Sequence, residues 1–382
     1  MKLARIQDSF LDVISDVEAG RVNHEDVWAE IIDGETKSGK FRVFKDKIEP
    51  LNPGLTLRKL DHWKYQLSDE ESTLKCVFPV EKYDLISHNL TSVDVTAKCN
   101  FVVGDRNGRL LYGKLGSKGG ELKEVIAHDG GTIKVCYFPS DKVLLSAGLD
   151  MMLKIWDCET GDNVRTFAGH RASITDFSLI GRGRNFVTSS LDAKLKLWEC
   201  SSGMCVASMD CLCGITTVKI HQDKSLANSV LNASIENLFE VDGKTAICGL
   251  ENGSLKFWRI ADQALIKHLD TGNKTAVTDL AIVEDAIYVG YSSGKLLEIG
   301  LKDFKIKELV DVAERIDNVK VIGSYIVISF GSGTLVGYNI ENAEAPIYLT
   351  GLENEVPVAD ICIQDKSIYA VGKYGLFKEF LL

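Results

Sequence analysis

The chain has 382 residues, of which 45% are hydrophobic and 26% charged, a composition that predicts one large globular domain with a smaller one. Its formal net charge of -10 argues against nucleic-acid binding, because a phosphate backbone requires a basic surface. No signal-peptide pattern, membrane-length apolar run or disulfide framework is present, and the ten cysteines therefore predict a reducing compartment. We expect a cytoplasmic location, with the nucleus as an alternative, and no membrane partner.

Residues 1–76 do not follow the pattern of the rest of the chain, and we interpret them as a small α+β module. Apolar residues recur at helical spacing between residues 10 and 17, which predicts a short amphipathic helix. The apolar residues at 27–32 are interpreted as an extension of its apolar face. Alternating apolar and polar residues at 41–44 predict a strand. The pattern leaves open whether the module caps the following domain or forms a docking surface of its own.

Residues 127–157 and 169–199 repeat one pattern at an interval of 42 residues. Each copy carries a histidine, a hydroxyl, an aspartate and a tryptophan that can join through hydrogen bonds, and such a buried network fixes one local geometry. The interval, with GH near the start and WD at the end, is typical of a WD repeat, which folds as one four-stranded blade. We therefore predict that the two sets are structural tetrads and not catalytic acids and bases. Their residues are His128, Ser146, Asp150 and Trp156 in the first copy, and His170, Thr188, Asp192 and Trp198 in the second.

Two-residue turns recur before each predicted third strand, most with glycine second, where a tight turn needs positive φ. They are Asn107-Gly108, Asp150-Met151, Asp192-Ala193, Asn252-Gly253, Ser293-Gly294, Ser332-Gly333 and Tyr374-Gly375. These turns predict an all-β fold, a seven-bladed WD-repeat β-propeller over residues 77–382. Because the sequence ends on a third strand, residues 72–80 are predicted to supply the outer strand of the last blade and to close the ring. Residues 222–243 form an insertion between the first and second strands of one blade.

The loops that enter the first strands and the turns before the third strands are expected to converge on one face, called here the top face. Its candidate protein-binding residues are six carboxylates and one arginine: Asp129, Arg171, Glu251, Glu314, Asp317, Glu353 and Glu355. Converging carboxylates would attract a lysine- or arginine-rich partner, and the alternative left open for each is a solvated rim.

The cysteines at 200, 205, 211 and 213 do not have the spacing of a zinc site, and no nucleotide, hydrolase or metalloprotease motif is present. We therefore predict no catalytic residue, no cofactor and no metal.

The sequence at 162–203 resembles the corresponding repeat of the proteasomal-ATPase-associated factor family, the WD-repeat assembly chaperones of the proteasome regulatory particle. The shared run is Gly-His at 169–170, Asp176, Arg-Gly-Arg-Asn at 182–185, Ser-Leu-Asp at 190–192 and Leu-Trp-Glu-Cys at 197–200. Residues 149–156 look like the preceding blade of the family, and the order of parts is similar along nearly the whole chain.

The resemblance implies a non-enzymatic chaperone that binds the C-terminal domain of a base ATPase subunit through acidic residues of the propeller. Glu355 looks like one such contact, whereas residues 212–217 lack a carboxylate that some family members carry. Other base assembly chaperones are further candidate partners, and we expect a monomer when the chain is free.

Two other classes of function remain open. Substrate adaptors of cullin-type ubiquitin ligases commonly show Trp-Asp-x-Arg at the end of a third strand. Here the three residues that follow Trp156, Trp198 and Trp258 are Asp-Cys-Glu, Glu-Cys-Ser and Arg-Ile-Ala, so no copy fits. Nothing in the sequence excludes a generic WD-repeat scaffold.

Overall fold

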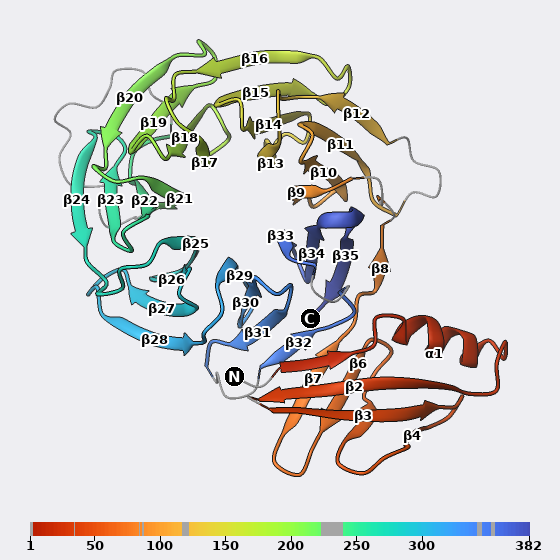
Figure 1. Cartoon of the computed structure of the whole chain (residues 1–382). Helices are drawn as coiled ribbons and strands as arrows, with labels where there is room; N and C mark the ends of the chain where they lie inside the picture. Colours follow the sequence, from red (N-terminus) through yellow and green to blue (C-terminus); the bar gives the residue numbers. More distant parts are fainter. Residues whose placement is uncertain are drawn as a thin grey trace.

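A ring of β-sheets with a smaller module beside it makes up the computed structural model (Figure 1). The structure describes residues 3–33, 35–83, 85, 88–116, 122–222, 240–341, 346–352 and 356–382. Most of the predicted insertion at 222–243, together with Glu353 and Glu355, lies outside the described residues. Within the described ranges, seven sheets surround the axis, and we number them blade one to blade seven in chain order.

The first five blades each have four strands that follow one another from the axis outward. Their strands are β9 (Leu90–Val95), β10 (Asn100–Asp105), β11 (Arg109–Lys114) and β12 (Lys123–Ile126); β13 (Thr132–Tyr137), β14 (Val143–Gly148), β15 (Met152–Asp157) and β16 (Asn163–Ala168); β17 (Ile174–Ile180), β18 (Asn185–Ser190), β19 (Lys194–Glu199) and β20 (Cys205–Asp210); β21 (Ile215–Gln222), β22 (Lys244–Leu250), β23 (Leu255–Arg259) and β24 (Ala264–Leu269); β25 (Val277–Val283), β26 (Ala286–Tyr291), β27 (Lys295–Gly300) and β28 (Ile306–Asp311).

The last two blades borrow strands from the beginning of the chain. Blade six consists of β29 (Ile316–Ile322), β30 (Tyr325–Phe330), β31 (Leu335–Asn339) and β32 (Ile347–Leu349), and continues into β7 (Thr73–Val77), β6 (Lys64–Ser68) and β5 (Thr56–Lys59). Blade seven consists of β33 (Val358–Gln364), β34 (Ser367–Gly372) and β35 (Phe377–Leu381), with β8 (Glu81–Lys82) outermost; the 3-10 turn η2 (Lys373–Gly375) joins β34 to β35.

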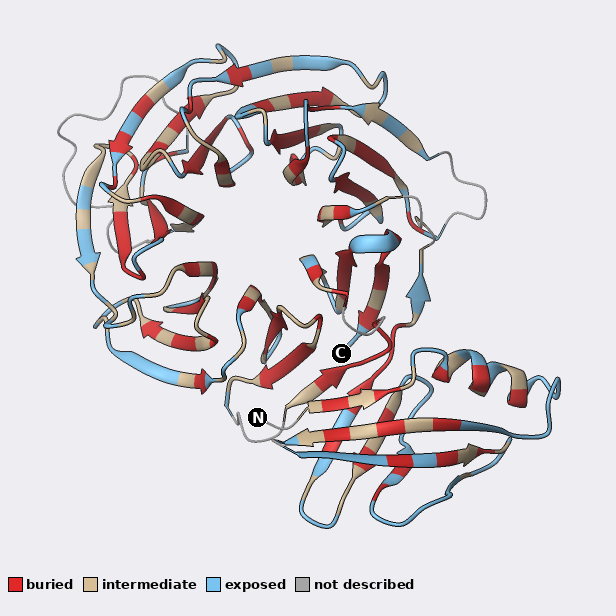
Figure 2. Ribbon diagram, in the orientation of Figure 1, coloured by how far each residue is buried: buried red, intermediate tan, exposed pale blue. Residues whose placement is uncertain are grey.

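Burial decreases from the middle of each blade to its rim (Figure 2). The second strands are almost wholly buried, as in β18, because they pack on the neighbouring blades with both faces. The outermost strands alternate or are mostly exposed, as in β16. The second strands are therefore built from apolar and small residues, as in VLLSAG of β14, whereas the outer strands carry charged residues as well.

Ring closure differs from the sequence prediction. Residues 72–80 were predicted to complete blade seven, but their strand, β7, pairs in parallel with β32 of blade six. Blade seven is completed by β8 instead, with Lys82 opposite Lys378 and Glu81 opposite Glu379. The prediction was wrong because β7 has the apolar alternation of a longer strand, whereas both residues of β8 are exposed and show no pattern.

The module beside the ring contains α1 (Phe10–Glu18) and a four-stranded sheet of β1 (Leu3–Ile6), β2 (Glu25–Asp33), β3 (Glu35–Val43) and β4 (Ile48–Pro50). The helix α1 occupies the predicted place. Residues 27–32, which were interpreted as helical, belong instead to strand β2, so that prediction was wrong. Val27, Ala29 and Ile31 are buried at a spacing of two, and the partly buried Trp28 and Ile32 on the other face had hidden this alternation.

One hydrophobic core joins the module to blade six. Phe10, Tyr65 and Phe78 are fully buried and pack ring against ring, with centroids 4.9–5.4 Å apart. The same cluster of buried side chains includes Tyr338 and Tyr348 of blade six. Sheet pairing through β7 and this shared core together fix the module to the ring.

Candidate protein-binding face and central channel

Both predicted tetrads form continuous hydrogen-bonded chains. In blade three, His170 contacts Asp192 through Nδ1 at 2.8 Å and Thr188 Oγ1 through Nε2 at 2.6 Å. Trp198 Nε1 donates to the same Thr188 hydroxyl at 2.8 Å. Blade two repeats the arrangement: His128, Ser146, Asp150 and Trp156 are linked at 2.7–3.0 Å.

A neutral imidazole satisfies every link of a tetrad. Nδ1–H donates to the aspartate, the unprotonated Nε2 accepts from the hydroxyl, and the hydroxyl oxygen accepts from the indole N–H. Burial lowers the pKa of His128 and His170, although the neighbouring aspartates oppose the shift. The imidazoles are therefore neutral and hydrogen-bonded to the carboxylates, and the tetrads are self-contained structural units.

Backbone hydrogen bonds tie the loop that enters each inner strand to the turn between the second and third strands. Leu149 N donates to Gly131 O, Leu191 N to Ser173 O, and Glu251 N to Gly214 O, at 2.9–3.0 Å. Blades five and six have the same bond. These contacts place the loops and the turns on one face of the ring, the predicted top face.

The structure places the predicted binding residues on four different blades of that face. Asp129 and Arg171 lie in the loops that enter blades two and three, and both are exposed. Glu251 lies in the turn of blade four and is exposed. Glu314 and Asp317 lie at the entry of blade six. The described residues thus share a face without forming a single cluster.

The two carboxylates at blade six are already engaged within the chain. Glu314 accepts a hydrogen bond from Ser332 N at 2.7 Å. Asp317 contacts Arg315 Nε at 2.7 Å, and burial raises the pKa of Asp317 against the opposing effect of Arg315. Among the described residues, Asp129 and Glu251 have no ion-pair partner, so these two are the most available for a partner.

A β-bulge near the top of the inner strand recurs in all seven blades, and in blade one the residue just after it is Ser92. The extra residue turns a polar side chain toward the central axis. In blades two to seven the residues just after the bulges are Lys134, Asp176, Thr217, Asp279, Asn318 and Asp360. They line the channel mouth, a hollow of about 150 Å³, which also includes Asp317.

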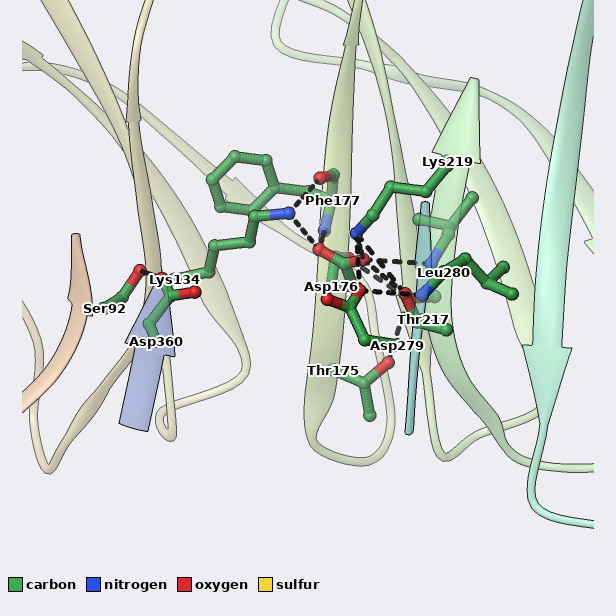
Figure 3. Close-up of polar contacts among 12 residues, drawn as sticks. Ser92, Lys134, Thr175, Asp176, Phe177, Thr217, Lys219, Asp279, Leu280 and Asp360 are labelled. Carbon is green, nitrogen blue, oxygen red and sulfur yellow. Dashed lines mark hydrogen bonds and ion pairs between the residues drawn. The ribbon is translucent and has the colours of Figure 1, made fainter. Parts of the chain in front are cut away.

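Alternating charges link five consecutive inner strands across this mouth. Figure 3 shows four of them, Lys134, Asp176, Lys219 and Asp279. Asp176 pairs with Lys134 on one side and with Lys219, at 2.8 Å, on the other. Asp279 pairs with Lys219 at 3.3 Å and with Lys320 at 2.6 Å. Burial alone would raise the pKa of both aspartates, but the lysines outweigh it and hold that of Asp279 at about 2 and that of Asp176 lower still.

The same aspartates also clamp neighbouring blades through the backbone. Asp176 accepts from Val218 N of blade four at 3.0 Å, and Asp279 accepts from Val319 N of blade six at 3.1 Å. Asp360 of blade seven accepts from Ser92 Oγ of blade one at 2.8 Å. This last contact closes the ring at the axis.

Comparisons with known proteins agree with this architecture. The family described as "WD domain, G-beta repeat" matches residues 119–157 and 161–199, which contain both tetrads. The chain is also 28% identical over 312 residues to the 26S proteasome regulatory subunit RPN14 of Saccharomyces cerevisiae, an alignment that covers 74% of each chain. The chain is a WD-repeat β-propeller protein.

The relationship to the yeast subunit confirms the predicted resemblance to the proteasome-associated WD-repeat family. A second relative of this WD-repeat protein, the Denticleless protein homolog of Danio rerio, is 38% identical over only 53 residues. That alignment spans 14% of this chain and 8% of the relative, and it carries no argument about function.

The sequence analysis did not predict the alternating charges at the channel mouth of this WD-repeat protein. A signal for them exists, because Lys134, Asp176 and Asp279 occupy the same position in their inner strands, each just before a buried apolar residue. A third histidine–aspartate pair was also missed: His88 Nδ1 lies 3.1 Å from Asp105 in blade one.

Among the described residues, no group of three or more histidine, cysteine, aspartate or glutamate side chains is placed to hold a metal ion. No helix in the described ranges is long and apolar enough to cross a membrane.

Replacing Asp176 by asparagine is expected to lower the free energy of unfolding by about 3–5 kcal/mol, because Lys134 loses its carboxylate and Lys219 loses one of two. A depressed carboxyl pKa gives stability that is present above the unfolded value near 4 and is lost as the pH falls below it. The difference between the wild type and the variant should therefore be constant at neutral pH and shrink below about pH 4. Urea unfolding at several pH values measures both effects.

Asp317→Asn, at the same channel mouth, is the matched control. Its carboxylate pairs only with the exposed Arg315 among the described residues, so its loss is expected to cost under about 1 kcal/mol. Equal losses for the two variants would contradict a structural role of the Lys134–Asp176–Lys219 chain.

Proposed function

We propose that this protein is a non-enzymatic assembly chaperone for the base of the proteasome regulatory particle, acting in the cytoplasm and the nucleus. In this proposal, a seven-bladed propeller uses its top face to bind the C-terminal domain of a proteasomal ATPase subunit. The observation that carries the proposal is the similarity to a 26S proteasome regulatory subunit over 74% of both chains, far beyond the two matched repeats.

The charge of the protein supports a basic partner surface. The formal net charge is -10, and the exposed carboxylates of Asp129 and Glu251 lie on the top face without an ion pair among the described residues. Glu353 and Glu355 lie outside the described residues, and the family resemblance implies a contact for Glu355. Complementary charge mainly raises the association rate, and pairs that become desolvated then slow dissociation.

The full-length protein, tagged and incubated with cell extract, is expected to capture a base ATPase subunit. Reversing Glu251 and Glu355 together to lysine should weaken this capture, and raising the salt concentration should weaken the wild-type complex, because rim charges are screened. Each exposed pair contributes under about 1 kcal/mol, whereas a desolvated one costs about 2–5 kcal/mol when truncated. Quantitative pulldown at two salt concentrations measures both effects.

The control reverses an exposed carboxylate on the opposite face. Glu284 lies in the turn between β25 and β26, at the far end of the inner strand from the top face. Glu284→Lys should leave capture and melting temperature unchanged. Capture of cullin adaptors instead of a base ATPase would support the ubiquitin-ligase alternative, and capture of neither would leave a generic scaffold.

A further inference from the structure

Large apolar side chains are exposed on the top face of blades two and three and in the loop that enters blade four. Leu149 is 58% exposed, Leu191 43% and Leu212 83%, and Met151 and Met152 beside Leu149 are also exposed. We call Leu149, Met151, Met152, Leu191 and Leu212 the apolar arc. Soluble proteins rarely expose apolar side chains in contiguous sets unless the surface binds something.

The members of the arc are connected through short backbone contacts. Met152 pairs with Ala168, which leads directly into the loop that contains Arg171. Farther along the face, Cys211 N donates to Ala193 O at 2.8 Å, which brings the loop of Leu212 against the turn of Leu191. The members of the arc therefore lie on successive turns and loops of the top face from blade two to the entry of blade four, with the loop of the exposed Arg171 against the turn of Leu191.

Two arc residues adopt a backbone conformation that side chains disfavour. Met151 has φ of 61° and Leu212 has φ of 62°, both in the left-handed region. Met151 occupies the turn position at which five of the seven blades carry glycine. An exposed side chain at such a position contributes little to folding and adds backbone strain. Strain of this kind is often found at functional sites, where the side chain has a use outside the fold.

Carboxylates flank the arc at both ends. Asp129 lies beside the turn of Leu149, where its N–H contacts Asp150, and Glu251 contacts the loop of Leu212 through Gly214 O. The exposed Arg171 lies between them, where its N–H contacts Asp192. A complementary surface would have an apolar centre, basic side chains at both ends and an acidic group near its middle.

We propose that the apolar arc is the part of the top face that the partner covers. Resting on the function proposed above, the occupant is the C-terminal domain of the ATPase subunit, which presents an apolar surface with lysine or arginine at its edges. Apolar burial then supplies most of the affinity, and Asp129 and Glu251 orient the partner. A second copy of this chain is a poorer match, because carboxylates would meet carboxylates.

The test replaces both strained arc residues by glycine in the full-length protein, as Met151→Gly with Leu212→Gly. Because glycine relieves the positive φ, the melting temperature should stay the same or rise. Affinity for the ATPase subunit captured by the wild type should fall at least tenfold, and the loss should persist at high salt, unlike the effect of Glu251→Lys. Titration with the purified subunit at low and high salt measures both.

The matched control is Met204→Gly, since Met204 is 64% exposed in blade three, in the turn between β19 and β20 on the opposite face. It should bind like the wild type. If the wild type captures no ATPase, the proposed function fails. If it captures the ATPase and the arc variant binds equally well, this inference is overturned while the function stands. A wild-type dimer that the arc variant dissociates would also overturn it, by making the arc a contact between copies.

Discussion

Replacing Trp198 by alanine is expected to lower the free energy of unfolding by about 3–5 kcal/mol, because a large buried ring leaves a cavity. The side chain is 1% exposed and packs against Phe167 and Phe186, with ring centroids 5.8 and 6.4 Å away. Its loss also leaves Thr188 without the indole donor that completes the tetrad. Urea unfolding followed by far-UV circular dichroism measures the change.

Trp198→Phe separates the two contributions. It keeps an aromatic ring in the site but removes the N–H that donates to Thr188 Oγ1, so it is expected to cost about 1 kcal/mol for the hydrogen bond plus a small packing loss. Arg171→Ala, on the exposed top face of the same blade, should change stability by under about 0.5 kcal/mol. A Trp198→Ala protein as stable as Arg171→Ala would contradict the structural role of the tetrad.

A chain that begins at residue 79 is expected to be insoluble or to melt without cooperativity, although it keeps β8. Removing the module uncovers the edge of β32 and the buried side chains of Tyr338 and Tyr348. An unpaired edge beside exposed aromatic surface favours aggregation. Soluble yield and the sharpness of thermal unfolding measure this result.

Phe78→Ala tests the same junction without truncation. Phe78 is fully buried between Phe10 and Tyr65, and its loss is expected to cost about 3–5 kcal/mol. Trp63→Ala, a partly exposed aromatic residue of the same module, should cost much less. A soluble, cooperatively melting protein that starts at residue 79 would show that the ring does not depend on the module.

The tetrads could be predicted from sequence because they are local and repeated. All four members fall within one repeat, so the spacing of His170, Asp192 and Trp198 already identifies the network. The ring closure could not be predicted in this way. The strand β8 has two exposed residues and no periodicity. The neighbouring β7 does alternate between exposed and buried residues, but it belongs to another blade.

The sequence predicted which face of the ring carries the candidate binding residues, but not how they are spread over that face. Turn positions place Asp129, Glu251 and Asp317 on the top face, yet they give no measure of how far apart the blades stand or which carboxylates already have partners. The channel charges were missed for a different reason. A single lysine or aspartate within an apolar inner strand has no evident partner in the sequence. Only the structure shows that five neighbouring inner strands place opposite charges next to one another.

The ring is closed twice by residues from opposite ends of the sequence, at the axis by Ser92 with Asp360 and at the rim by β8 with β35. During synthesis on the ribosome, blade one therefore lacks its contacts with blade seven until residues 358–381 have emerged. Long-range closure of this kind slows folding and leaves earlier intermediates with exposed edges. Nascent chains stalled before residue 358 should thus be open arcs that depend on cellular chaperones, and release of the last blade should convert them to a protease-resistant ring in one late step.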